Sequence, residues 1–222
     1  MKRILIVAPH PDDETLGCGG SLLKHRDCGD EINWAIMTGI SVADGYDIDM
    51  VEKRTNEINA VSEKYGFDNV FNLGFPTTRL DLIPRSQLIK CVSDIIQAMK
   101  PDQIYLPYRN DVHSDHKITF ETVVSASKTF RCPFLKKVLM YEVLSETEFA
   151  PPLLDCAFVP NSFSDISHYI EKKLAVMHMY GSESGEHPFP RNNFNIRALA
   201  TFRGATAGLN SAEAFMVLKE IW

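Results

Sequence analysis

Short apolar segments alternate with longer amphipathic segments from the start of the chain to about residue 141. The short segments are rich in Ile, Val and Leu and are bounded by turn residues, which predicts buried strands; the longer ones show helical spacing. We predict strands over 3–8, 31–38, 69–73, 103–107 and 136–141, with helices over about 14–27, 49–65, 84–99 and 115–129 between them. This alternation predicts an α/β fold: a three-layer, Rossmann-like, mostly parallel sheet with helices on both faces.

The pattern changes after residue 145, where several prolines interrupt the alternation. In this region we predict a strand near 154–159, a helix over about 163–179, a loop over 181–191 and two closing helices over about 192–203 and 211–221. No repeat, low-complexity tract or linker divides the chain. We therefore expect a single domain over residues 1–222, with a C-terminal elaboration over about 145–222.

Histidine and acidic residues follow the first and the fourth predicted strands. His10, Asp12 and Asp13 follow the first strand, and the run from Asp111 to His116 follows the fourth. These two strands are neighbours in the common doubly wound order, so the two clusters are expected to meet at the edge where such sheets keep their chemistry. Crowded imidazole and carboxylate groups favour a divalent cation, and two histidines with one carboxylate form the ligand set of a catalytic zinc. One further acid is then free to act as a base.

Two simpler interpretations compete with a metal site. Asp12 and Asp13 could merely cap the helix that follows them, because acidic side chains offset the unpaired N–H groups of a helix start, but capping does not require His10. The run Gly17-Cys18-Gly19-Gly20 resembles a dinucleotide loop, yet it begins about two helical turns after the strand end. The second strand also ends without the acidic residue that binds the ribose in dinucleotide-binding folds. Close packing of the helix on the sheet explains these glycines better, which argues against a nucleotide-sugar oxidoreductase.

Both clusters carry recognisable motifs. Pro9-His10-Pro11-Asp12-Asp13-Glu14 precedes His113-Ser114-Asp115-His116 along the chain. On these motifs the chain resembles the PIG-L/LmbE family of zinc-dependent N-deacetylases, hydrolases that remove the acetyl group from N-acetylglucosamine-type sugars. Further similarity lies at Arg54 and Glu57, Leu73-Gly74-Phe75-Pro76, Arg203-Gly204 and Ala212-Glu213-Ala214-Phe215. The resemblance implies an LmbE-like fold and hydrolysis of a linear amide C–N bond.

The resemblance also implies roles for the residues of the two motifs. His10, Asp13 and His116 would bind a catalytic Zn²⁺, with Fe²⁺ or Co²⁺ as other divalent candidates, and a water would take the fourth position. Asp12 would be the base that takes a proton from this water. His113, in its protonated form, would stabilise the oxyanion and protonate the leaving amine.

Four further residues are candidates for the same site. Asp115 is two residues from His113 and could hold its tautomer or raise its pKa. Some sugar deacetylases of the family have Tyr two residues before the second motif, where this chain has Asp111, so Asp111 could instead bind a sugar hydroxyl. Arg54, on a charged predicted helix, and His187, in the 181–191 loop, are candidates for substrate contact.

The composition limits the class of partner and the compartment. The 222 residues are 45% hydrophobic, enough for a large core, and carry a net charge of −6 with a pI near 5.6. This balance argues against nucleic acid or an anionic membrane as a partner, and no apolar run is long enough for a membrane span or a signal peptide. Five cysteines without C-x-x-C spacing indicate neither a disulfide framework nor a cysteine zinc site, which suits a cytoplasmic protein.

Two alternatives to an N-acetyl-sugar deacetylase stay open at this point. An amidohydrolase acting on a formyl or longer acyl group would share every catalytic residue. A non-catalytic metal-binding protein would keep the ligands but would not need Asp12 and His113. The expected partner is a small-molecule or conjugated amino-sugar substrate, and the oligomeric state, including a homo-oligomer, is left open.

Overall fold

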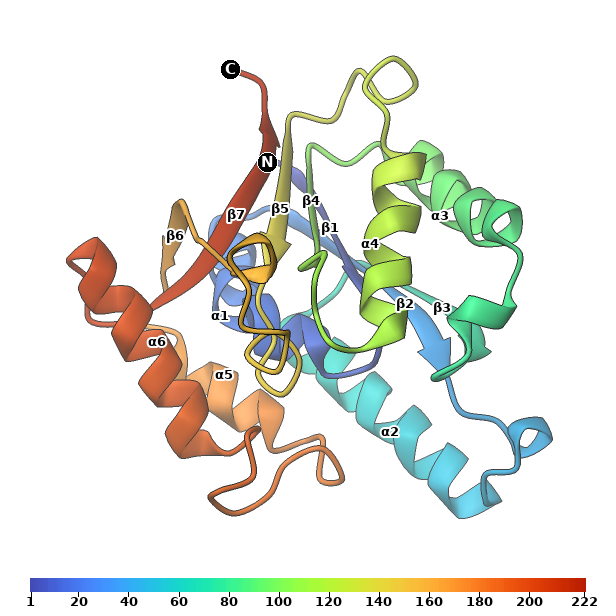
Figure 1. The fold of residues 1–222 in the computed structure, drawn as a ribbon, viewed down its shortest axis with the longest axis horizontal. Helices are drawn as coiled ribbons and strands as arrows, with labels where there is room; N and C mark the ends of the chain where they lie inside the picture. The colour runs from blue at the N-terminus through green and yellow to red at the C-terminus, as the bar shows by residue number, and fades with distance from the viewer.

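The computed structural model describes all residues from 1 to 222, and a seven-stranded sheet runs through its centre (Figure 1). The strands are β1 (Arg3–Ala8), β2 (Glu31–Gly39), β3 (Asn69–Pro76), β4 (Gln103–Pro107), β5 (Lys137–Tyr141), β6 (Ser162–Asp165) and β7 (Ala212–Glu220). Their order is β3-β2-β1-β4-β5-β7-β6. The first five strands are parallel, and β7 runs antiparallel to both β5 and β6. The predicted α/β fold with a mostly parallel sheet is confirmed.

Helices cover both faces of the sheet. They are α1 (Asp13–Asp27), α2 (Ile48–Tyr65), α3 (Arg85–Met99), α4 (Ser114–Ala126), α5 (Ile170–Met177) and α6 (Asn193–Ala207). Side chains alternate along a strand, so Ile4 and Ile6 of β1 join the core beneath α1 and α2, whereas Leu5 and Val7 join the core beneath α3 and α4. None of the helices combines the length and the apolar character that crossing a membrane requires.

The predicted switch point lies between β1 and β4. These strands pair directly, with Ile4 opposite Gln103, and β2 lies on the other side of β1. Connections that leave β1 and β4 therefore diverge at the carboxyl edge of the sheet, where such folds bind their ligands. Both motifs of the sequence follow these two strands and meet at this edge.

The predictions beyond residue 145 are partly wrong. Residues 154–159, predicted as a strand, form no strand and contain only the short 3₁₀ turn Leu154–Cys156. The helix predicted over about 163–179 is shorter, because the sheet takes its first residues as β6 and α5 begins only at Ile170. The helix predicted over about 211–221 is the strand β7. Its residues favour helix locally, but β5 and β6 on either side satisfy its backbone groups, and this tertiary pairing overrides the local preference.

Helix α1 packs so closely that its glycines are required. A Cβ atom on Gly17 would lie 2.3 Å from the ring of Tyr141, and one on Gly20 would lie 2.6 Å from Ile166. Close packing, not a nucleotide loop, thus explains the glycine run.

Helix α1 is also broken internally, where Cys18 has φ −148° and ψ 22°. The amides of Gly20 and Ser21 donate to the two carboxylate oxygens of Glu213 on β7, each at 2.8 Å. Lys173 of α5 donates to Glu213 at 2.7 Å and to the carbonyl of Leu16 at 2.8 Å. A buried ion pair from the C-terminal region therefore completes the interrupted hydrogen bonding of α1.

Candidate active site

The turn between β1 and α1 places two candidate ligands next to a third from α4. Asp13 opens α1, and its Oδ2 accepts the amide of His10 at 2.8 Å, which fixes the turn. The same Oδ2 lies 3.3 Å from Nδ1 of His10 and 3.3 Å from Nε2 of His116, in the first turn of α4. The structure thus brings together the three residues predicted as metal ligands.

The spacing and bonding of these atoms fit a divalent metal. In a tetrahedral zinc site with ligand bonds of about 2.0–2.1 Å, neighbouring ligand atoms are about 3.3–3.4 Å apart, which is the spacing that Asp13 makes with each histidine. Nε2 of His116 is fully buried and makes no well-aligned hydrogen bond in the protein, although the Asp13 carboxylate lies 3.3 Å away. A buried ring nitrogen left without a partner is costly unless a ligand occupies it. The donor set of His10, Asp13 and His116 therefore suits a bound cation.

The ring of His116 is held from behind by two residues. Its Nδ1 lies 2.9 Å from Oδ2 of Asp111, and Thr147 donates to Oδ1 of Asp111 at 2.6 Å. A carboxylate on the far nitrogen of a metal-binding histidine orients the ring and makes the free nitrogen more basic. Asp111 is completely buried, so the prediction that it binds a sugar hydroxyl is wrong: its carboxylate belongs to His116.

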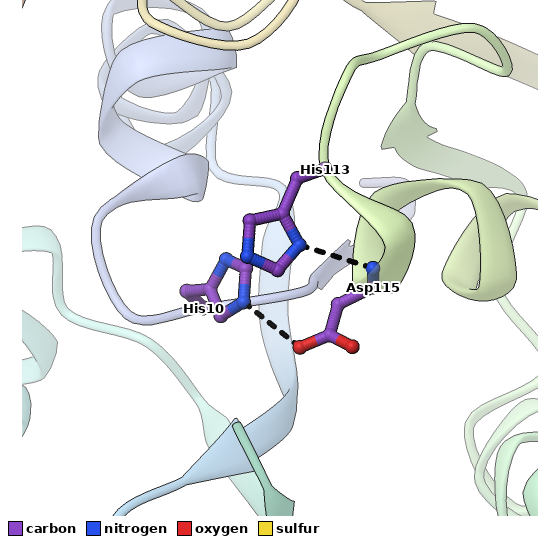
Figure 2. Close-up of side chains that lie close together, drawn as sticks. All are labelled: His10, His113 and Asp115. Atoms are coloured by element: carbon purple, nitrogen blue, oxygen red, sulfur yellow. Dashed lines mark hydrogen bonds and ion pairs between the residues drawn. The ribbon is translucent and has the colours of Figure 1, made fainter. Parts of the chain in front are cut away.

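Asp115 supports His10 in the same way (Figure 2). Its Oδ2 lies 3.2 Å from Nε2 of His10 and also accepts the amide of Thr78 at 2.7 Å. Its Oδ1 accepts the amide of Leu80 at 3.1 Å. His10, His113 and Asp115 are also close enough to form a ligand group, but these hydrogen bonds already occupy the carboxylate of Asp115. The group of His10, Asp13 and His116 is therefore better suited to a metal.

His113 is oriented by the backbone of Asp115. The amide of Asp115 donates to Nδ1 of His113 at 3.0 Å, as Figure 2 shows, so the proton of the neutral ring resides on Nε2. Burial, with the nearby His10 and His116, lowers the pKa of His113 to about 4. Both observations argue against the predicted protonated His113. Asp115 thus holds the tautomer of His113, as expected, but it does so through its backbone amide, while its carboxylate bonds to His10.

The acids and histidines of the cluster shift one another's pKa values. Burial alone would lower the pKa of His10, but hydrogen bonds to Asp115 and Asp13 raise it to about 9. Burial would likewise raise the pKa of Asp13, but His116 and His10 hold it well below its usual range. Without a metal, the carboxylates thus keep protons on the imidazoles, and a cation would compete for the same sites.

Asp12 lies beside this set without belonging to it. Its backbone has φ 131°, a conformation that non-glycine residues rarely adopt, and Glu14 accepts its amide at 3.0 Å. Glu14 is itself held by Thr15 at 2.6 Å and by Tyr180 at 2.8 Å. Burial and the neighbouring Asp13 raise the pKa of Asp12 well above its ordinary value, and Arg191, 3.0 Å from its Oδ2, acts in the opposite direction.

A cavity of about 380 Å³ opens in front of His10, Asp12 and His113. One wall is a charged network in which Arg54 and Arg191 both contact Glu183, the latter pair at 3.2 Å. The other residues that line the cavity are Pro11, Thr38, Gly39, Ile40, Tyr46, Met50, Thr77, Thr78, Glu146 and Ser182. The cavity is large enough for a small polar ligand and presents several hydrogen-bonding groups to it.

The two remaining candidates from the sequence, Arg54 and His187, differ in outcome. Arg54 lines the cavity as expected, and its guanidinium also donates to the carbonyl of Pro11 at 3.2 Å. His187 is exposed, packs against Phe194 at 5.8 Å between ring centroids, and is not among the lining residues. The loop that carries it instead supplies Arg191, which sequence reasoning missed because one arginine in a loop gives no periodic or motif signal.

A mostly parallel sheet that carries a buried His/Asp set and a spare carboxylate at its switch point is typical of hydrolases that use a metal ion. Comparison with known proteins identifies the family. Residues 5–127, more than half of the chain, match the family model PIG-L, described as GlcNAc-PI de-N-acetylase. The chain therefore belongs to the PIG-L family of de-N-acetylases, and the predicted family is confirmed.

Individual relatives support this assignment along most of the chain. The uncharacterized deacetylase YaiS of Escherichia coli is 29% identical over 188 residues, which cover 82% of this chain and 91% of YaiS. The diacetylchitobiose deacetylase of Thermococcus kodakarensis is 23% identical, covering 100% of this chain and 85% of its own. Among solved structures, the conserved protein TT1542 of Thermus thermophilus superposes with a TM-score of 0.77 at 25% identity, covering 100% and 97% of the two chains.

Proposed function

We propose that this protein is a zinc-dependent hydrolase that removes the N-acetyl group from an N-acetylglucosamine-type sugar conjugate. The observation that carries the proposal is the convergence of His10 Nδ1 and His116 Nε2 on one oxygen of Asp13, with Asp12 beside them in the lining of the cavity. Three protein ligands leave a fourth position open, which is the arrangement of catalytic and not structural zinc sites. Fe²⁺ or Co²⁺ would suit the same donors.

Asp12 is the proposed base. When bound by His10, Asp13 and His116, a zinc ion supplies a Lewis acid for the acetyl carbonyl and lowers the pKa of a nearby water. Asp12 takes a proton from the attacking water, and burial beside Asp13, which raises its pKa, makes it a stronger base than an exposed aspartate. The contact with Arg191 keeps the Asp12 carboxylate in place during this step.

His113 acts as a neutral hydrogen-bond donor. Its Nδ1 accepts the amide of Asp115, so its Nε2–H is available to the carbonyl oxygen of the acetyl group as negative charge develops there. With a pKa of about 4, His113 holds no second proton to give to the leaving amine at neutral pH. Asp12, having taken a proton from water, is then the group that returns one to the amine nitrogen as the C–N bond breaks.

The names of the relatives support an amino-sugar substrate. The Thermococcus kodakarensis relative is a diacetylchitobiose deacetylase, and a Bacillus anthracis relative, 22% identical, is a probable N-acetyl-α-D-glucosaminyl L-malate deacetylase. The cavity offers donors and acceptors of the kind that sugar hydroxyls require.

All five cysteines are free, and Cys28 is exposed, which supports a reducing compartment such as the cytoplasm.

Acetate release from a panel of N-acetylglucosamine conjugates tests this proposal. Purified protein loaded with zinc is incubated with each conjugate, and loss of the acetyl group is followed by mass spectrometry. We expect deacetylation that chelation abolishes and zinc restores. Matched N-formyl and N-butyryl conjugates separate an acetyl-specific enzyme from a broader amidohydrolase, and turnover of none of them, with zinc bound, would contradict the proposal.

A further inference from the structure

Glu146 is the one acid of the cavity wall that has no partner in the protein. Three acids line the cavity: Asp12 contacts Arg191, and Glu183 contacts both Arg54 and Arg191. The carboxylate of Glu146, the third, makes neither a hydrogen bond nor an ion pair with any residue of the chain. It is half-buried, and burial raises its pKa. A half-buried carboxylate without a donor is unfavourable, which points to a donor that arrives with a ligand.

Hydrogen bonds tie the segment that carries Glu146 to the loop of the candidate metal ligands. Ser145 has φ 79°, and its amide donates to Glu148 at 2.6 Å, which fixes the turn before Glu146. The carbonyl of Glu146 accepts the amide of Val112 at 3.1 Å. The next residue, Thr147, donates to the Asp111 carboxylate that orients His116. The backbone of Glu146 is therefore anchored next to the residues that orient His116.

Glu146 is not itself suited to bind the metal. Its carboxylate belongs to neither group of side chains whose ligand atoms lie within 4.8 Å of one another. It faces the same cavity as His10, Asp12 and His113, so it can contact the part of a substrate that extends beyond the reacting amide. Donors that approach a carboxylate there are hydroxyl or ammonium groups, because a carboxylate only accepts hydrogen bonds.

We infer that Glu146 is a substrate-binding residue whose carboxylate accepts hydrogen bonds from the sugar hydroxyls next to the acetamido group, an inference that rests on the amino-sugar substrate proposed above. Such charge-assisted hydrogen bonds are stronger than neutral ones and select for position. The same charge disfavours a substrate that places a phosphate or carboxylate at this point of the cavity. Glu146 thereby directs the enzyme towards sugars whose ring hydroxyls near the acetamido group are free.

Kinetics with deoxy sugars test this role. The probes are methyl N-acetyl-β-glucosaminide and its 3-deoxy, 4-deoxy and 6-deoxy analogues, compared for wild type, Glu146→Gln and Glu146→Ala. We expect Glu146→Ala to lower kcat/KM for the parent sugar about 10- to 100-fold, mainly through KM, with zinc content unchanged. The 3-deoxy analogue, which lacks the hydroxyl next to the acetamido group, should show a similar fall in kcat/KM with wild type, and Glu146→Ala should turn it over no more slowly than it turns over the parent sugar. Glu186→Gln removes an exposed carboxylate outside the cavity and should match wild type.

Two results would overturn the inference. One is an unchanged KM for the parent sugar in both Glu146 variants; the other is an equal further loss for every deoxy analogue in Glu146→Ala, which would indicate a general structural effect. Calorimetric binding of methyl β-glucosaminide, the expected product, gives a measurement that does not need turnover. Weaker binding by Glu146→Gln than by wild type for this product, but not for its 3-deoxy analogue, which carries the same ammonium group, supports the inference even if the acetyl sugar is not hydrolysed, and equal or absent binding contradicts it.

Discussion

The N-terminal and C-terminal parts of the chain both reach the active-site cavity, but they contribute different things. The first 126 residues supply the candidate ligands, the proposed base Asp12 and the proposed donor His113, all close to the ends of β1 and β4. The part after β5 supplies groups that hold these residues in place: Thr147 behind Asp111, Tyr180 on Glu14, and Arg191 on Asp12. Reactive groups come from local turns, whereas their orientation comes from distant segments, so the two parts should respond differently to substitution.

The largest effect on activity should come from a ligand in the N-terminal part. Replacing His116 with Ala removes one of three ligands, so we expect loss of bound zinc together with a loss of turnover greater than for substitution of Asp12, His113 or Arg191. Elemental analysis of dialysed protein and acetate release measure the two effects. Full metal occupancy in this variant would show that the ligand set is wrong.

Asp12→Asn should separate metal binding from catalysis. The amide cannot accept a proton, and general base catalysis contributes about 10²–10⁴-fold, so turnover should fall by that factor while zinc stays bound. Zinc content and kcat are measured on the same preparation. Loss of zinc in parallel with activity would make Asp12 a ligand.

Substitutions of His113 test whether this residue acts as a neutral hydrogen-bond donor or as a proton-donating acid. With a pKa of about 4, it is uncharged above about pH 6, and a bound cation would lower that pKa further. Replacement by Ala should lower kcat about 10²–10³-fold, as for loss of one oxyanion donor, and replacement by Gln should retain part of the activity because its amide can still donate. Neither variant should move the basic limb of the profile of kcat/KM against pH. If the basic limb disappears in His113→Gln, His113 acts in its protonated form, as predicted from the sequence.

Arg191 tests the contribution of the C-terminal part. Replacing it with Gln removes a charge-assisted contact to Asp12, and we expect kcat/KM to fall about 10- to 100-fold with zinc retained. Arg191 lowers the pKa of Asp12, so its loss should raise that pKa and shift the acidic limb of the pH profile to higher pH. Arg197→Gln removes an exposed arginine paired with Glu171 and serves as the control. An acidic limb at the wild-type position would show that Arg191 does not act through Asp12.

The smallest effect on turnover and a large effect on stability are expected at Glu213. Glu213→Gln breaks a buried pair with Lys173, which typically costs about 3–5 kcal/mol, while no group in the cavity changes. Urea unfolding followed by circular dichroism measures the loss, and kcat is determined well below the unfolding transition. Lys90→Gln, in an exposed pair with Asp94, should leave the urea midpoint close to wild type. A midpoint for Glu213→Gln equal to that of Lys90→Gln would show that the buried pair does not hold α1.

The same division explains what could be predicted from the sequence. The strands and helices up to β5 could be predicted from hydrophobic periodicity. The pairing of β1 with β4 follows from the usual strand order of doubly wound folds, so both motifs could be placed at one edge of the sheet. The partner of Asp115 could not be predicted, because amides of Thr78 and Leu80 on another loop fix its carboxylate. Arg191 lies 179 residues from Asp12, and no local pattern links the two. Strand β7 depends on neighbours on both sides, which local propensity does not include.

The contact of Glu213 with the broken turn of α1 has a consequence for attempts to transplant this chemistry. The segment that matches the family model, residues 5–127, contains every candidate ligand and the proposed base. Two amides in the helix directly after the turn of these residues are nevertheless completed only by a residue near the C-terminus. Grafting the motif onto another Rossmann-like scaffold would leave these amides unpaired in a buried position. A designer would therefore need to carry over the acceptor with the motif, or redesign α1 as an unbroken helix with residues other than glycine and a correspondingly wider gap to the sheet.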